Sequence, residues 1–205
     1  MPASQPTVTI KTFIPLAVPG EPVPLLLEVS DTNASAQAAA FTFAVSFGDG
    51  HSTTFSSKSP VLVNHVYTKT GTFTVTVTAT DEYGHASTAA TAPIKVVSVA
   101  VETDPFNSSQ TALFVGTSGT ETIGFTPSGK SGISVTLGGT NEGVFTTSGP
   151  LVVFGQGGKD TVRESGLKNP LYVLQSPTAD NVESDLDQEA IKWAGLKAAV
   201  EILNA

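Results

Sequence analysis

The chain contains no cysteine among its 205 residues, so disulfides, thiolate metal ligands and cysteine nucleophiles are all excluded. Charged residues make up only 14 %, against about 25 % in an average globular protein, which argues against a charge-rich disordered chain or a coiled coil. Basic residues are scarce, and the net charge of −8 without a basic patch excludes nucleic acid as a partner. No apolar run approaches the roughly 18–20 residues that cross a bilayer, so no membrane span is expected.

The beginning of the chain also lacks a feature of exported proteins. The first six residues, MPASQP, have neither the positive charge nor the apolar stretch of a signal peptide. We interpret the sequence as a segment of a longer exported chain, since strand-like sequence starts almost at once. The acidic balance suits divalent cations and a calcium-rich exterior.

Short runs of alternating apolar and polar residues, broken by Gly, Pro, Asn and Asp, fill residues 7–98. In the clearest run, 73–80, the apolar side chains share one face and four threonines share the other, which is the pattern of a half-buried strand. Further strands are expected at Thr7–Ile10, Leu25–Val29, Phe41–Phe47, Val61–Val63 and Ile94–Val97. Short strands at this density predict an antiparallel β-sandwich that needs no metal.

Three motifs follow one another in this segment: Phe47-Gly48-Asp49-Gly50, then a run from His65 to Val75, then Thr78 to Gly84. In this order they resemble the PKD domain, an immunoglobulin-like module, and the resemblance covers the chain to about Ala100. Where the family commonly has an aromatic-Asp-aromatic run before the turn, this sequence has Val45-Ser46-Phe47.

The residue types in these motifs have direct physical roles. Gly48 and Gly50 allow positive φ angles on either side of Asp49, which is the chemistry of a tight hairpin turn. Tyr67 stands at a strand edge, where its ring is suited to burial and its hydroxyl to a backbone hydrogen bond. The alternation lapses at residues 102–109, and we interpret this stretch as a polar joint with the domain boundary at residue 100.

Three similar segments follow the joint. In each, an apolar strand leads into a six-residue turn that ends in a carboxylate, and a β-branched residue follows two positions later. The segments are 113–123, 151–162 and 171–182, and their carboxylates are Glu121, Asp160 and Asp180.

The second segment resembles the calcium-binding nonapeptide of RTX and hemolysin-type repeats, whose turns stack into a parallel β-helix. The match runs from Gly155 to Arg163, with Gln156 in place of the second glycine. The resemblance implies Ca²⁺ held by Asp160, with help from Glu121 or Asp180 and from the backbone carbonyls of Gly155 and Gly157. The alternative is a solvated β-turn without metal.

The first two segments begin 39 residues apart, at Gly116 and Gly155, whereas adjacent turns on one face of a regular repeat helix lie about 18 residues apart. The residues between them, 133–145, read as a β-hairpin that accounts for the extra length.

The last 22 residues, 184–205, change period. A capping box at Ser184 and Asp187 precedes apolar residues at three- and four-residue spacings, which predicts an amphipathic C-terminal α-helix. Its apolar residues are Leu186, Ala190, Trp193, Leu196, Val200 and Leu203. We expect this helix to cap the repeat domain; pairing with another chain or with a downstream domain is the alternative.

The three histidines, His51, His65 and His85, lie near Asp49 and Asp81 in sequence, so a zinc or catalytic cluster is conceivable. We favour a structural interpretation in which His65 belongs to the strand-edge motif, while the other two are solvated turn residues. No serine lies in a Gly-x-Ser-x-Gly elbow, and the repeat region has no histidine to act as a base. We therefore expect no catalysis.

The expected architecture is mainly β: an immunoglobulin-like β-sandwich (1–100), a short β-helix-like repeat domain (101–183) and the C-terminal helix (184–205). The predicted function is that of a non-catalytic structural or adhesive module of a large secreted or cell-surface bacterial protein. One alternative is a carbohydrate- or protein-binding accessory module of an exported hydrolase, which an exposed line of aromatics would favour. Another is a self-assembling extracellular filament or coat subunit. The partners are accordingly a protein or glycan at the cell surface, or other copies of the chain.

Overall fold

A computed structural model describes residues 4–14, 16–104, 107–156, 160–175 and 181–184. The chain divides into two compact units. The first comprises Met1–Ala17, Pro22–His65 and Gly71–Lys95; the second comprises Val18–Glu21, Val66–Thr70 and Val96–Ala205. The predicted C-terminal helix, with Trp193, lies outside the described residues.

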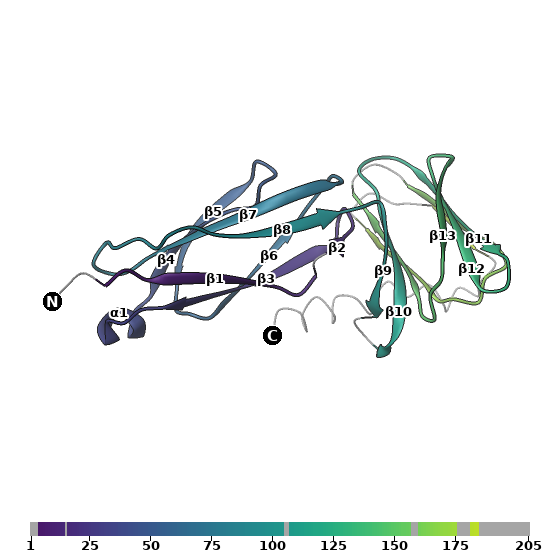
Figure 1. Ribbon diagram of the computed structural model, residues 1–205. Coiled ribbons are helices and arrows are strands. Elements are labelled where there is room, and N and C mark those ends of the chain that lie inside the picture. The colour runs from purple at the N-terminus through teal and green to yellow at the C-terminus, as the bar shows by residue number, and fades with distance from the viewer. Residues whose placement is uncertain (1–3, 15, 105–106, 157–159, 176–180, 185–205) are drawn as a thin grey trace. The chain divides into compact units, whose positions relative to one another are not determined.

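Two sheets make up the first unit (Figure 1). The smaller sheet has the order β1-β3-β6 and the larger has the order β2-β8-β7-β4-β5. Their strands are β1 (Thr7–Thr12), β2 (Leu16–Ala17), β3 (Pro22–Ser30), β4 (Phe41–Ser46), β5 (Ser52–Ser57), β6 (Val61–Val66), β7 (Gly71–Thr80) and β8 (Ala90–Val96). The helix α1 (Ala34–Ala38) is a single short turn between β3 and β4, and its N-cap is the side chain of Asn33.

The alternating pattern explains this sandwich. In β4, Phe41, Phe43 and Val45 are buried while the residues between them are exposed, and in β7 Val75 and Val77 are fully buried. The β4 strand pairs antiparallel with both β5 and β7. The predicted immunoglobulin-like β-sandwich is confirmed, and the ring of Tyr67 is buried as expected.

The second unit also contains two sheets, of orders β16-β14-β10-β9 and β13-β12-β11-β15-β17. The first contains β9 (Val99–Asp104), β10 (Asn107–Gly116), β14 (Leu151–Gly155) and β16 (Leu171–Gln175). The second contains β11 (Thr122–Ser128), β12 (Gly132–Leu137), β13 (Thr140–Phe145), β15 (Thr161–Glu164) and β17 (Asn181–Ser184). Inward-facing aliphatic and Phe side chains from both sheets, among them Leu113, Ile123, Phe125, Leu151 and Val162, form one apolar core.

The three sequence segments stack as parallel strands, which is the β-helix-like arrangement that their alignment predicts. Leu113 pairs with Leu151, which pairs with Leu171, so β10, β14 and β16 run side by side in register. In the other sheet β11, β15 and β17 pair in the same parallel way. The predicted hairpin between the first two segments is confirmed as β12 and β13, whose connecting Gly138 and Gly139 have φ angles of 55° and 86°.

The stretch 102–109 is not a polar joint. It forms the end of β9 and the start of β10, which pair antiparallel from Val99 opposite Val115 to Asp104 opposite Asn107. The acidic residues Glu102 and Asp104 make this sequence look like a solvated loop, although Val99, Val101 and Thr103 alternate as in a strand. In the structure Asp104 is buried rather than solvated. The boundary at residue 100 stays a prediction.

Candidate functional site

The most completely buried acidic turn residue is Asp160, which the sequence predicted as the main calcium ligand. Its side chain is 1 % exposed. One carboxylate oxygen accepts a hydrogen bond from the backbone N–H of Glu121 at 2.8 Å, and the other accepts one from the hydroxyl of Thr117 at 3.0 Å. Thr117 is itself 1 % exposed. Asp160 therefore ties the turn before β15 to the turn before β11 and holds the two stacked segments together.

Of the other predicted calcium ligands, the structure describes Glu121 and Gly155. Glu121 lies beside Asp160, and burial together with the nearby charges of Asp160 and Glu142 raises the pKa of Glu121. Gly155 is buried at the end of β14, whereas Gly157 and Asp180 lie outside the described residues. The structure thus brings Glu121 and Asp160 together.

A calcium ion at Asp160 would need ligands from several groups. Ca²⁺ takes six to eight oxygen ligands at about 2.3–2.6 Å. Two of the groups that contact the Asp160 carboxylate, the Glu121 N–H and the Thr117 hydroxyl, donate hydrogen bonds to it, and such donors stabilise a carboxylate in a turn. Calcium binding at these turns stays a prediction.

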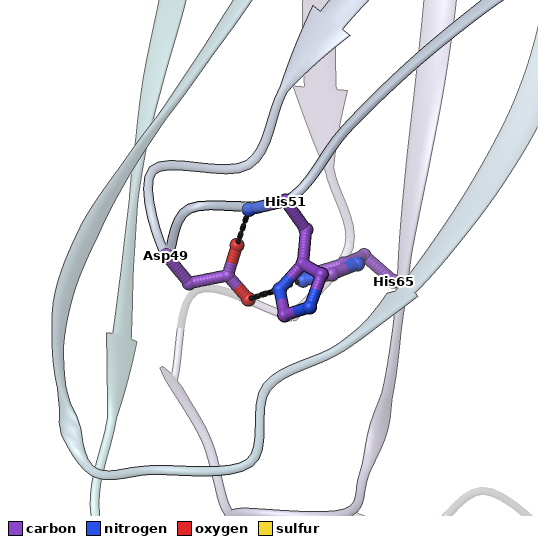
Figure 2. A group of neighbouring side chains, drawn as sticks. All are labelled: Asp49, His51 and His65. Carbon is purple, nitrogen blue, oxygen red and sulfur yellow. Dashed lines mark hydrogen bonds and ion pairs between the residues drawn. The ribbon is translucent and has the colours of Figure 1, made fainter.

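A second set of polar side chains surrounds Asp49 in the turn between β4 and β5 (Figure 2). One oxygen of Asp49 accepts from the backbone N–H of His51 at 3.0 Å. The other oxygen lies 3.1 Å from His51 Nδ1 and 2.7 Å from His65 Nε2. His65 comes from β6, in the other sheet, so the cluster joins the two sheets of the sandwich.

The surroundings fix two of these three side chains. The ring of Phe47 stacks on the ring of His65 with 3.9 Å between centroids and 3° between planes. The side chains of Asp49 and His65 are 12 % and 13 % exposed, whereas that of His51 is 71 % exposed. Burial alone would raise the pKa of Asp49, but hydrogen bonds from His65 and His51 outweigh it and lower the pKa to about 2.

Glycine is required next to Asp49 for two separate reasons. Gly48 and Gly50 have φ angles of 82° and 95°, in the region that side-chain-bearing residues rarely adopt. A Cβ on Gly48 would also lie 2.6 Å from the backbone oxygen of Thr74. The Gly-Asp-Gly motif is thus a tight turn packed against β7, as the sequence predicts.

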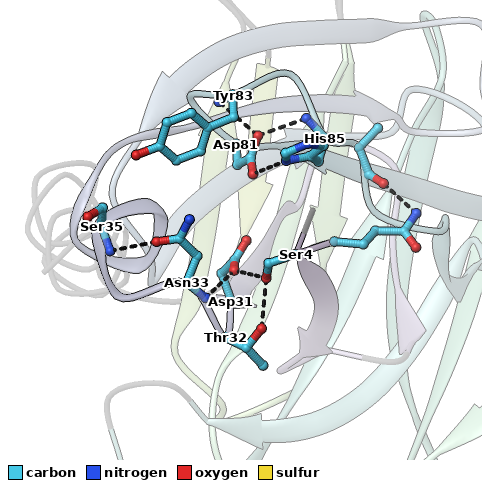
Figure 3. A network of polar contacts seen from close by, with 10 residues as sticks. Ser4, Asp31, Thr32, Asn33, Ser35, Asp81, Tyr83 and His85 are labelled. Carbon is cyan, nitrogen blue, oxygen red and sulfur yellow. Dashed lines mark hydrogen bonds and ion pairs between the residues drawn. The ribbon is translucent and has the colours of Figure 1, made fainter. Parts of the chain in front are cut away.

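A similar turn is built around Asp81 (Figure 3). One of its oxygens accepts from the backbone N–H groups of Tyr83 and His85, and the other lies 2.8 Å from His85 Nδ1. Burial raises the pKa of Asp81, but the hydrogen bonds from His85 and Tyr83 have the larger combined effect and lower it. In the same view, Asp31 accepts from the hydroxyl of Ser4 and from the backbone N–H of Asn33.

The expectation that His51 and His85 are simply solvated is wrong, because each lies within hydrogen-bond distance of an aspartate in its own turn. The spacings Asp49-x-His51 and Asp81-x₃-His85 are local signals that could have shown this, since a turn brings residues two or four apart together. The approach of His65 to Asp49 depends on the packing of two sheets and has no such local signal.

The fold and these turns define the class of the first unit, an immunoglobulin-like β-sandwich. Residues 7–94 match the family model of the PKD domain, so this part of the chain is a PKD domain, as its motifs indicated. No curated protein matches the chain.

Several solved structures resemble part of the chain. The PKD domain of an M14-like peptidase from Thermoplasmatales archaeon SCGC AB-540-F20 is 20 % identical, with a TM-score of 0.39 over 46 % of this chain and 98 % of that one. The PKD1 domain of Vibrio anguillarum Epp is 21 % identical, with a TM-score of 0.34 over 45 % and 96 %. A structure of carbohydrate-binding modules from the β-sandwich superfamily is 23 % identical, with a TM-score of 0.39 over 45 % and 34 %.

Proposed function

We propose that this chain is a non-catalytic structural segment of an exported bacterial protein, in which the PKD domain and the stacked β unit serve as folded spacers. PKD domains are non-catalytic accessory modules and occur in extracellular proteins. In the described part of the chain, no helix combines the length and the apolar character needed to cross a membrane. The occurrence of PKD domains in extracellular proteins supports export.

One observation carries this proposal: Asp160 and Asp81, which accept several hydrogen bonds each, accept them from residues of turns. Asp160 accepts from two groups of a stacked turn, and Asp81 accepts from residues two and four positions further on. A general acid or base must instead lie within hydrogen-bond reach of a substrate's proton. These carboxylates stabilise the fold, which is what a spacer requires.

The exposed aromatic residues argue against the carbohydrate-binding alternative. Among the described residues, Phe13 and Tyr83 are the large aromatics with more than half of their surface exposed, at 51 % and 55 %. The ammonium group of Lys11 already lies 5.4 Å from the centroid of the Phe13 ring. The line of aromatics that would favour glycan binding is absent from the described residues.

Retention on polysaccharides tests the choice between these two functions. The chain and its Tyr83→Ala variant are run by affinity electrophoresis through gels that contain soluble cellulose, xylan or chitin derivatives. The structural proposal predicts the same mobility for both proteins with and without polysaccharide. Retention of the wild type that Tyr83→Ala abolishes would contradict the proposal and favour the carbohydrate-binding module.

Protein binding is a second candidate, because one groove favours it. An open groove of about 550 Å³ lies between β5 and β6 and is lined partly by Phe47, Phe55, Val61 and Val63. In the described sheets β5 and β6 are outermost strands, and an outermost strand can accept an extended peptide by β-augmentation. Selection from a displayed peptide library tests this candidate: a peptide that binds the wild type but not a Leu62→Asp variant of the groove supports it.

Self-assembly is the third proposal. In the described part of the second unit, β16 and β17 are the outermost strands of the two parallel stacks, where a further coil could add. Light scattering over a wide concentration range tests it. A constant monomer mass favours the spacer, and a mass that rises with concentration favours the filament or coat subunit.

A further inference from the structure

We propose that Asp49, His51 and His65 form a binding site for a divalent transition-metal ion, with zinc as the principal candidate. One oxygen of Asp49 and one ring nitrogen from each histidine all lie within 4.8 Å of one another. Figure 2 shows both imidazole rings beside this carboxylate. The chain has only three histidines, and two of them meet at this point.

The ligand atoms lie close enough together for a small tetrahedral site, which would move the Asp49 oxygen and each ring nitrogen apart by less than about 1 Å. With metal–ligand bonds of about 2.0–2.2 Å, the ligand atoms of a tetrahedral zinc ion lie about 3.3–3.6 Å apart. The Asp49 oxygen is 3.1 Å from His51 Nδ1 and 2.7 Å from His65 Nε2. The remaining separation, between the two histidine nitrogens, can adjust by rotation of the His51 side chain, which is 71 % exposed.

The ligand chemistry selects the class of ion. Two imidazole nitrogens and one carboxylate oxygen suit zinc, copper or nickel, whereas calcium and magnesium take oxygen ligands. Three protein ligands leave the fourth coordination position of a tetrahedral ion open. Because the His51 side chain is exposed to solvent, a water molecule can occupy that position. A metal ion binds imidazole in its neutral form and carboxylate in its ionised form, so binding of the ion competes with protons.

The supporting contacts hold the ligands in place before an ion arrives. The second oxygen of Asp49 accepts from the backbone N–H of His51, and the Phe47 ring covers one face of His65. Such outer contacts orient metal ligands and strengthen binding. Because His65 belongs to β6 while the other two ligands flank the β4–β5 turn, a bound ion links the two sheets of the PKD domain.

The Asp81–His85 pair provides a matched control. It has the same kind of contact, with 2.8 Å between the carboxylate and the ring, and His85 is also partly exposed. Among the described residues, no third His, Asp or Glu side chain lies close enough to this pair to complete a metal site. Removal of His85 should therefore leave metal binding unchanged.

Titration calorimetry with zinc chloride at about pH 7.5, on protein without a histidine tag, tests the proposal. We expect one equivalent to bind the wild type, His51→Ala to weaken binding more than 10-fold, and His85→Ala to have no effect. Cobalt should give the visible absorption bands of a four-coordinate ion in the wild type and in His85→Ala only. Circular dichroism checks that His51→Ala is folded, which its exposure predicts.

Three results would overturn the proposal. They are an absence of zinc binding to the wild type, equal affinity in the wild type and His51→Ala, and a loss of affinity in His85→Ala as large as that in His51→Ala. Each would show that the three neighbouring side chains serve only to hold the turn.

Discussion

Removing the Asp160 carboxylate tests whether hydrogen bonds alone hold the stacked turns together. Asp160→Ala deletes the acceptors for the Glu121 N–H and the Thr117 hydroxyl, and it leaves the buried hydroxyl the longer contact with the Phe154 carbonyl oxygen, at 3.5 Å, as an acceptor. A hydrogen bond to a charged group contributes about 1.5–3 kcal/mol, so the two together predict a loss of about 3–6 kcal/mol in unfolding free energy. That is a large part of the about 5–15 kcal/mol of a typical domain.

Two further variants make this prediction sharper. Asp160→Asn keeps one acceptor for the Glu121 N–H and should lose only about 1–2 kcal/mol. Glu142→Ala removes an exposed carboxylate from β13 and should change stability by less than about 0.5 kcal/mol.

Urea unfolding followed by circular dichroism measures these differences, and hydrogen exchange locates them. Peptides around Thr117 and Asp160 should lose protection in Asp160→Ala, while peptides of the PKD domain stay unchanged as an internal control. Melting curves of the wild type with millimolar calcium and with a chelator test the calcium prediction separately. A loss below about 1 kcal/mol in Asp160→Ala would refute the hydrogen-bond account. A melting temperature that calcium raises in the wild type but not in Asp160→Ala would support the calcium prediction.

Two other predictions follow from buried groups and tight turns. Burial and the neighbouring Glu102, which lies in the same unit, raise the pKa of Glu21 from 4.5 to about 8, so the folded chain keeps a proton that the unfolded chain releases. The stabilisation, on the order of 5 kcal/mol, is complete below about pH 4.5 and is lost as the pH rises to about 8. The melting temperature should therefore decrease as the pH rises from about 5 to about 9. A Glu21→Gln variant whose melting temperature decreases as steeply with pH as that of the wild type would refute this. Gly48→Ala should destabilise the PKD domain more than Gly50→Ala, because both have positive φ but only the first places a Cβ against backbone; equal losses in urea unfolding would contradict the close contact with Thr74.

How much of the fold the sequence predicts depends on how clearly each strand alternates. The β7 strand has apolar residues at every second position and a row of threonines between them, so both its existence and its buried face could be predicted. The sequence does not predict the β5 strand, because STTFSS offers only Phe55 as an apolar residue. The sequence of β9 indicates a polar joint rather than a strand, because an aspartate is normally solvated. That Asp104 is buried depends on tertiary packing, which the sequence pattern does not contain.

The parallel stack could be predicted because similar segments that repeat along a chain tend to lie side by side. The alignment placed Leu113, Leu151 and Leu171 together, and the strands pair in that register. What the alignment could not provide is the partner of Asp160. Thr117 lies 43 residues away in sequence, and their hydrogen bond follows only once the turns are stacked.

The structural role is tested most directly in the longer exported protein that we propose for this segment, by replacing residues 1–205 with two unrelated folded β-sandwich domains of similar total length. A spacer predicts that the hybrid reaches the cell surface or medium at the normal level and keeps the activity or adhesion of the parent protein. A hybrid that is exported normally but has lost that activity or adhesion would contradict the structural role and show that this segment itself recognises a partner.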